Sequence, residues 1–241
     1  MTTHTTTGPT ATDSTTTTDG RASDPGTAPA DLSMYYLIHR ALGSGAERIA
    51  TAVRRCEVEG DWRRIDAVAA WYRGYQEELH LHHHLEDDEF FPALHDRVPV
   101  MAEHEPRLHH EHELVVAAMD RTDAALTALA AAKDDRALRA EAVAATTELR
   151  DILVAHLAYE DADILPLFVR HFGAEEYEEL EQAAMKSAPL RTQVFTVPFM
   201  VEAMQPGGER ETLMASAPMP LRVLYRLTRR RYARMTGAAF G

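Results

Sequence analysis

Cysteine is nearly absent from this chain of 241 residues, which contains only Cys56. A single cysteine excludes an internal disulfide and any zinc or iron–sulfur site built from several thiolates. A chain without disulfides is typical of a reducing compartment, so the cytoplasm is the expected location. No apolar run reaches the roughly 18 residues that a transmembrane helix needs. The N-terminus also lacks the apolar core of a signal peptide.

Basic residues are scarce: 25 Lys and Arg stand against 38 Asp and Glu, for a net charge of −13. This balance argues against general nucleic-acid binding, so no nucleic-acid partner is expected. Histidine, in contrast, is abundant, with nine of the 13 residues lying between His80 and His112. Because thiolates are missing, imidazoles and carboxylates would have to hold any metal, a combination that suits iron, manganese or zinc better than calcium.

The chain divides into three parts. Residues 1–30 hold almost no large apolar side chain, which predicts a disordered N-terminal tail. Residues 31–172 have helical periodicity with short connections, which predicts an all-α, up-down-up-down four-helix bundle. Residues 173–241 are expected to form a C-terminal helical extension that packs on the bundle. The four bundle helices are expected at about 31–57 (with a weak point at 43–45), 61–92, 106–133 and 135–171.

Two matching fragments about seventy residues apart are the strongest motif. One reads HHHLEDDEFFP from His82, and the other reads HLAYEDADILP from His156. In each fragment a His is followed four residues later by Glu86 or Glu160, and a Pro follows that Glu by six residues. Residues i and i+4 lie on the same face of a helix, so each fragment presents an imidazole and a carboxylate one turn apart.

Helical phase places a His on the apolar face of every bundle helix, and two helices add a Glu beside it. Counted from the connecting turns, most of these positions agree in height to about 3 Å, and the first helix agrees less closely. A buried carboxylate requires a cation, a proton or an Arg, and no Arg shares these faces at this height. We therefore expect a metal site in one layer of the core. The candidate ligands are His39, His82, Glu86, His112, His156 and Glu160.

The neighbouring polar residues are expected to be solvated. His80, His83, His84 and His110 are assigned to an exposed surface, as are Asp87, Asp88 and Glu89. Asp161 and Asp163 are candidates to accept hydrogen bonds from ligand imidazoles.

The order of these candidate ligands resembles the bacterial hemerythrin-like family, also called HHE cation-binding domains. The fragments ELHLHHHLEDDEFFPAL and LVAHLAYEDADILPLF carry the resemblance most specifically. It implies a four-helix bundle around two iron ions with an oxo or hydroxo bridge, with the four histidines as terminal ligands and the two glutamates as bridges. The ferritin type needs a Glu-x-x-His pair on each of two helices, whereas Glu77-x-x-His80 is a single instance whose His faces outward.

The chain departs from the oxygen carriers of that family, because Leu108 stands where they have a further His four residues before His112. About four protein bonds per iron would leave open positions, which favours reaction with O2, hydrogen peroxide or nitric oxide. His83, His109 or a core Tyr such as Tyr35 or Tyr75 remains open as an additional ligand. Catalase-like peroxide removal and oxygen or iron binding without turnover are both compatible with this site, and the sequence does not decide the oligomeric state.

Six arginines lie between residues 222 and 234, near the C-terminus, interspersed with apolar residues. A basic amphipathic helix of this kind binds anionic lipid or nucleic acid in some proteins. The preferred expectation here is a lid, whose Leu face packs on the bundle and whose arginines meet the acidic surface.

Overall fold

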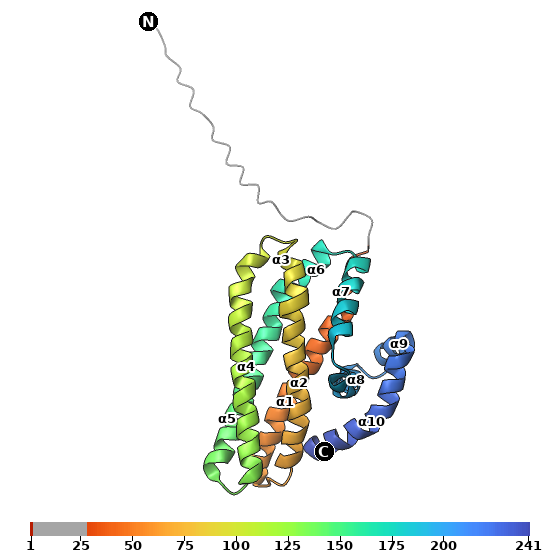
Figure 1. Ribbon diagram of the computed structural model, residues 1–241. Helices are drawn as coiled ribbons and strands as arrows, with labels where there is room; N and C mark the ends of the chain where they lie inside the picture. The colour runs from red at the N-terminus through yellow and green to blue at the C-terminus, as the bar shows by residue number, and fades with distance from the viewer. Residues whose placement is uncertain (2–27) are drawn as a thin grey trace.

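The computed structural model describes residue 1 and residues 28–241, and these are almost entirely helical (Figure 1). The described residues contain no β-strand, only one isolated bridge between Pro29 and Gly173. The prediction of an all-α fold is therefore confirmed. The predicted disorder of the N-terminal tail concerns mainly residues 2–27, which lie outside the described residues.

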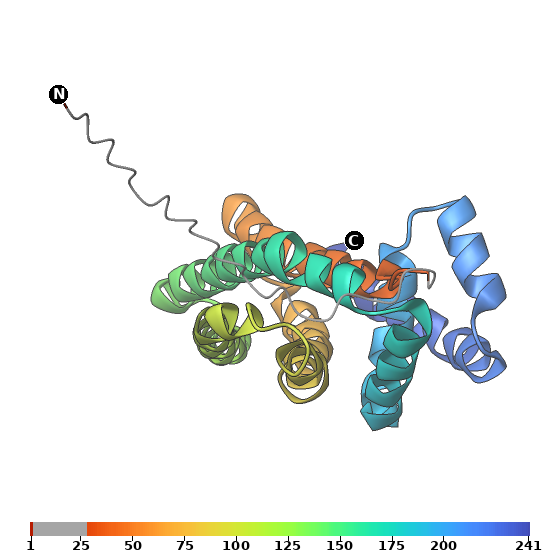
Figure 2. The ribbon, with the colours of Figure 1, turned by 90° about the horizontal axis from the view of Figure 1, so that it is seen from above.

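Four antiparallel rods form a bundle, seen from above in Figure 2. Two rods are single helices, and each of the other two consists of an α-helix, a π-helical turn and a short final helix. Each rod packs against two neighbours, so that they surround one core. The rods are α1 (Ser33–Glu59); α2 (Ile65–Leu85), η1 (Glu86–Phe90) and α3 (Phe91–His95); α4 (Met101–Ala131); and α5 (Arg136–Tyr159), η2 (Glu160–Ile164) and α6 (Leu165–His171).

Local chemistry explains where the rods begin and end. Gly60 ends α1 with a φ of 69°, a left-handed conformation that glycine adopts without steric cost. The carboxylate of Asp135 accepts hydrogen bonds from the backbone N–H groups of Ala137 and Leu138 and so caps α5. The second rod begins at Ile65, four residues later than expected, because Asp61 organises a turn by accepting from the backbone of Arg63 at 3.1 Å.

The two π-helical turns occupy equivalent places in the repeated motif. Each begins at the motif glutamate and ends one residue before the helix that contains the motif proline. Proline has no N–H and its ring clashes with the carbonyl four residues earlier, so an α-helical ladder cannot continue through it. The backbone instead closes i→i+5 bonds, from Phe91 N–H to the Glu86 carbonyl and from Leu165 N–H to that of Glu160.

The bundle has two hydrophobic clusters with the polar layer between them. One cluster includes Leu42, Leu79 and Leu153, and the other includes Tyr35 and Phe90. The histidines of the motif lie between these two sets in the sequence of each rod. The candidate ligands are therefore enclosed by apolar side chains above and below.

Residues 174–240 form four further helices along the α1 and α2 side of the bundle (Figures 1 and 2). Their main anchor is Trp71 of α2, whose indole N–H donates to Thr236 Oγ1 and whose ring meets those of Phe195, Phe199 and Phe240. Among all the residues that the structure describes, no helix is long and apolar enough to cross a membrane. The four further helices are α7 (Ala174–Ser187), α8 (Leu190–Ala203), α9 (Gly208–Ser216) and α10 (Met219–Phe240).

Candidate metal centre

The structure brings all six candidate ligands together in the middle of the bundle. One comes from each of α1 and α4, and the two His–Glu pairs come from the α2–η1 and α5–η2 junctions. Each is at most 6% exposed, which is rare for histidine and glutamate. A seventh residue, His83 of α2, lies with them and is 4% exposed.

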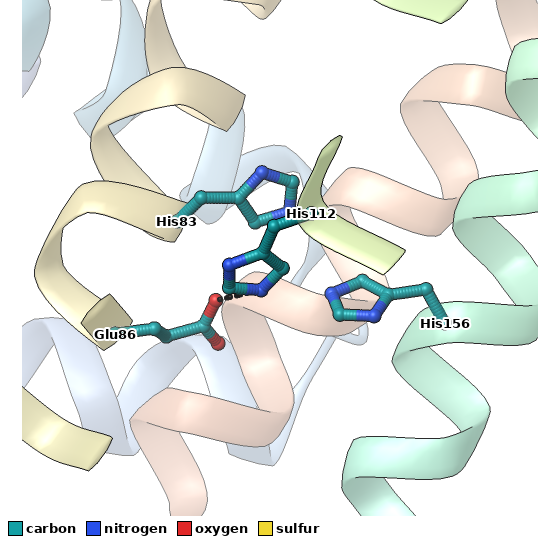
Figure 3. Close-up of side chains that lie close together, drawn as sticks. All are labelled: His83, Glu86, His112 and His156. Carbon is teal, nitrogen blue, oxygen red and sulfur yellow. Dashed lines mark ion pairs between the residues drawn. The ribbon is translucent and has the colours of Figure 1, made fainter. Parts of the chain in front are cut away.

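These side chains form two groups of possible metal donors, and in each group one ligand atom per residue lies within 4.8 Å of the others. The groups share Glu86. Figure 3 shows the first group, with residues from α2, η1, α4 and α5 pointing toward one another. The first group is His83, Glu86, His112 and His156, and the second is His39, His82, Glu86 and Glu160.

Both carboxylates lie between imidazoles of different helices. Glu86 directs Oε1 toward Nε2 of His82 at 3.1 Å and Oε2 toward Nε2 of His112 at 3.5 Å. Glu160 directs Oε1 toward Nε2 of His156 at 3.3 Å and Oε2 toward Nε2 of His39 at 3.5 Å. Each carboxylate can therefore serve two cations at once, one through each oxygen.

Outer carboxylates fix the orientation of three imidazoles. His39 Nδ1 donates to Asp161 at 2.7 Å, His112 Nδ1 to Asp87 at 3.0 Å, and His156 Nδ1 to Glu111 at 3.0 Å. A hydrogen bond at Nδ1 turns Nε2 inward and raises its basicity as a ligand. The role expected for Asp161 is confirmed. Asp87 is solvent-exposed, as expected, but it also accepts a hydrogen bond from His112. Glu111 was not identified from the sequence.

Tyr35 completes the second donor group. Its hydroxyl donates to Glu86 Oε1 at 2.7 Å, and its ring packs edge-on against His39 and His82. Tyr75, the other aromatic considered from the sequence, donates instead to the Leu42 carbonyl. His109 is exposed and lies beside Glu113 on its own helix, away from the centre.

The assignment of His83 to the solvated surface is wrong. Its ring stacks on that of His112, with centroids 4.3 Å apart, and meets the edge of His156 at 5.4 Å. Its phase lies at the border of the apolar face of α2, and the contact with α4 and α5 extends the buried face to include it. His83 thus adds a fifth imidazole to the buried cluster. Its position beside His82, at the edge of the apolar face, was the only sign in the sequence.

The buried histidines of the centre have strongly shifted pKa values. Burial opposes charge on His39 and His112, yet Asp161 and Asp87 respectively, together with the buried glutamates, raise the pKa of each to about 10. Burial lowers the pKa of His82 to about 3. His39 and His112 therefore carry positive charge beside Glu86, whereas burial and the charge of Glu86 raise the pKa of Glu160. Bound cations would replace the protons that this site now holds.

Several buried polar atoms of the centre lack a hydrogen-bond partner. They lie among the candidate ligands, and their imidazole and carboxylate chemistry suits a transition metal. The residues therefore fit a metal site. The atoms are Nε2 of His39, His82, His112 and His156, both ring nitrogens of His83, Glu86 Oε2 and both oxygens of Glu160.

A helical bundle with buried imidazoles and carboxylates defines a class, the four-helix proteins that bind metal cations between their helices. The hemerythrin HHE cation-binding domain model matches residues 32–168, more than half of the chain. The chain belongs to the hemerythrin HHE cation-binding family. A search of curated proteins and a search of solved structures each returned no match.

Proposed function

We propose that this protein holds two iron ions and binds or reacts with O2, hydrogen peroxide or nitric oxide. The observation that supports it is the pair of donor groups that share Glu86, with unpartnered nitrogen and oxygen atoms facing inward. Two iron ions at this place would supply two-electron exchange with such a small molecule. A cytoplasmic location stays a prediction.

The two donor groups differ in their number of imidazoles, and this difference supports one of them as the place where the small molecule binds. His83, His112 and His156 give one group three imidazoles, whereas His39 and His82 give the other only two. Glu160 directs Oε1 toward His156 at 3.3 Å, so the first group can also use this carboxylate and then has one donor more than the second. The second group therefore leaves more room for an exogenous ligand, and the hydroxyl of Tyr35 lies on that side. We expect the small molecule to bind there.

The surrounding residues limit the reaction to small molecules. The candidate ligands are buried between two apolar clusters, so bulk water and larger substrates are excluded. Tyr35 can donate its hydroxyl proton to Glu86 or to a ligand that displaces this contact. Burial and the charges of Glu86 and Glu160 raise the pKa of Tyr35, so it remains a proton donor at neutral pH.

His83 also favours the alternative of binding without turnover. A fifth imidazole leaves fewer open positions than the four-histidine set expected from the sequence, and fewer open positions favour a stable adduct. The two hypotheses share the metal centre and differ in the fate of added peroxide.

Metal analysis followed by visible spectroscopy tests the proposal. Purified protein is expected to contain about two iron ions per chain and to change its spectrum on exposure to O2, peroxide or nitric oxide. The variants His82→Ala and Glu86→Ala are expected to lose most of the iron and the spectral change. His84→Ala is the matched control, because this imidazole is 65% exposed and lies beside Asp88.

Oxygen release from added peroxide separates the two hypotheses. Sustained release that disappears in His82→Ala supports peroxide removal, whereas a stable spectrum without release supports binding or sensing. Protein that folds but takes up no iron under ample supply would refute both.

A further inference from the structure

The outward face of α10 has an unusual mixture of apolar and basic side chains. Met219 is 62% exposed, Val223 44% and Leu227 75%, although these are large apolar residues. The helix packs on α2 and α8 through Thr228, Tyr232, Thr236 and Ala239, which lie on its opposite side. The expectation that the apolar residues of this helix pack on the bundle is therefore wrong for Val223 and Leu227, whereas Tyr232 is buried.

Five exposed arginines accompany these apolar residues. At 100° per residue, Arg226, Arg230 and Arg234 fall with Met219, Val223 and Leu227 within an arc of about 100°. The helix contains no acidic residue. Within residues 28–241 none of the five guanidinium groups forms an ion pair or hydrogen bond, contrary to the expected contact with the acidic surface. The five are Arg226, Arg229, Arg230, Arg231 and Arg234.

Nearby carboxylates do not neutralise this face because they already have partners. Glu202 of α8 pairs with Arg48 at 2.7 Å, and Glu209 of α9 pairs with Arg40 at 2.8 Å. The basic partners in both pairs come from α1, so they join the extension to the bundle. The arginines of α10 are left facing solvent in a chain whose net charge is −13.

We propose that this face of α10 docks on the surface of a membrane that contains anionic phospholipids. Arginines bind lipid phosphates, and the apolar side chains between them reach into the boundary between headgroups and acyl chains. Nucleic acid would satisfy the arginines, but its phosphate backbone offers no apolar contact for the three exposed apolar side chains. The first half of α10, which carries those side chains, stands away from the bundle in Figure 1.

The acidic bundle does not prevent such docking. At physiological salt, charges are screened over about 8 Å, so a surface senses mainly the side chains that touch it. Docking through one edge of the extension leaves the four rods on the far side of α10 from the lipid. The docking face is independent of the proposed iron chemistry, because its residues are outside the metal centre.

Vesicle flotation with full-length protein tests the proposal. The protein is expected to float with vesicles of phosphatidylcholine containing about 30% phosphatidylglycerol, and not with phosphatidylcholine alone. Arg226→Gln/Arg230→Gln/Arg234→Gln is expected to weaken partitioning about 100-fold. Val223→Gln/Leu227→Gln, which keeps every charge, is expected to weaken it about 10-fold. Arg54→Gln/Arg73→Gln/Arg136→Gln, three exposed arginines of the bundle, removes the same charge elsewhere and is expected to bind normally.

Circular dichroism and metal content verify that each variant is folded. Equal loss in the bundle control and the α10 triple variant would overturn the proposal, since net charge alone would then explain binding. Two further outcomes would also overturn it. In one, duplex DNA is bound but vesicles are not. In the other, salt-sensitive self-association disappears in the triple variant while vesicles remain unbound, which indicates a second copy of the chain as the partner.

Discussion

At the scale of single residues, His83 determines how many nitrogen donors the centre contains. It is buried without a hydrogen-bond partner on either ring nitrogen, and it stacks on His112. A buried imidazole without partners is costly unless a ligand satisfies it. We infer that His83 contributes directly to the metal site.

Replacing His83 by Ala is therefore expected to weaken binding of one metal ion by at least about 10-fold, as changes even beside a metal ligand do. Metal content after dialysis against graded chelator measures this, and about half of the metal should be lost first. His84→Ala, one residue further along, should retain the wild-type content because its side chain is 65% exposed. Identical affinity in His83→Ala and wild type would show that His83 is only a packing residue.

Glu78 is a second buried residue with a measurable consequence. It lies on α2 beneath α8 and accepts a hydrogen bond from the hydroxyl of Thr196. Burial raises its pKa from 4.5 to about 7. The folded chain therefore holds this proton more tightly than the unfolded chain does. The resulting stabilisation is complete below about pH 4.5 and is lost as the pH rises through 7.

Glu78→Gln should remove that dependence, because the amide stays neutral and its oxygen can still accept from Thr196. We expect urea unfolding to show that the variant is more stable than wild type at pH 8, by on the order of 1–3 kcal/mol. The two proteins should be nearly equally stable at about pH 4. Glu77→Gln, the exposed neighbour, serves as control and should not change the difference between the two pH values. A parallel pH profile for Glu78→Gln and wild type would contradict this account.

At the scale of helices, periodicity predicted the four rods and the inward phase of His39 and His112, because a regular α-helix preserves its phase over several turns. Regular phase could not predict the π turns at Glu86 and Glu160, since each inserts one residue into the repeat. The prolines six residues later were the visible signal. His83 lies at the edge of the apolar face of α2. Whether a residue at such an edge is buried depends on the helix packed against it, and the sequence of α2 alone does not show this.

Gly45 of α1 lies at a close approach between its own backbone, the Tyr75 ring of the bundle and Phe199 of the extension. A Cβ atom there would lie 2.4 Å from the Tyr75 ring and 3.4 Å from Phe199 of α8. The residues around it were expected to weaken the helix, but α1 is continuous through them. Glycine serves here to let rings approach the backbone, because Tyr75 is fully buried and its hydroxyl is held by Leu42.

Gly45→Ala is accordingly expected to lower the free energy of unfolding by about 1–3 kcal/mol through overpacking. The matched variant is Gly43→Ala on the same helix, where the new Cβ would meet only Leu157 at 3.8 Å. That change should stabilise the protein by up to about 1 kcal/mol, since alanine is the better helix former. Thermal and urea unfolding of the two variants measure the difference, and equal stability would contradict the packing argument.

At the scale of the whole molecule, the metal centre joins all four rods at one level. Its donors come from α1, α2–η1, α4 and α5–η2, which are distant in sequence and connected mainly by this layer and the two apolar clusters. Cations bound here would cross-link the bundle from inside and neutralise Glu86 and Glu160. Metal binding and folding would therefore be coupled, because the unfolded chain does not hold these donors together.

Chelation should reveal that coupling. Binding at a thousandfold excess over the dissociation constant stabilises a folded protein by about 4 kcal/mol, and for this chain length each kcal/mol corresponds to about 2–4 °C in melting temperature. We expect chelator-treated protein to remain helical but to melt at least roughly 8 °C lower than loaded protein. Glu86→Gln, which keeps the shape but removes a shared donor, should melt nearly alike with and without chelator. If chelation does not change the melting temperature of wild type, the buried carboxylates are balanced by protons alone. The layer would then be a polar core without a metal.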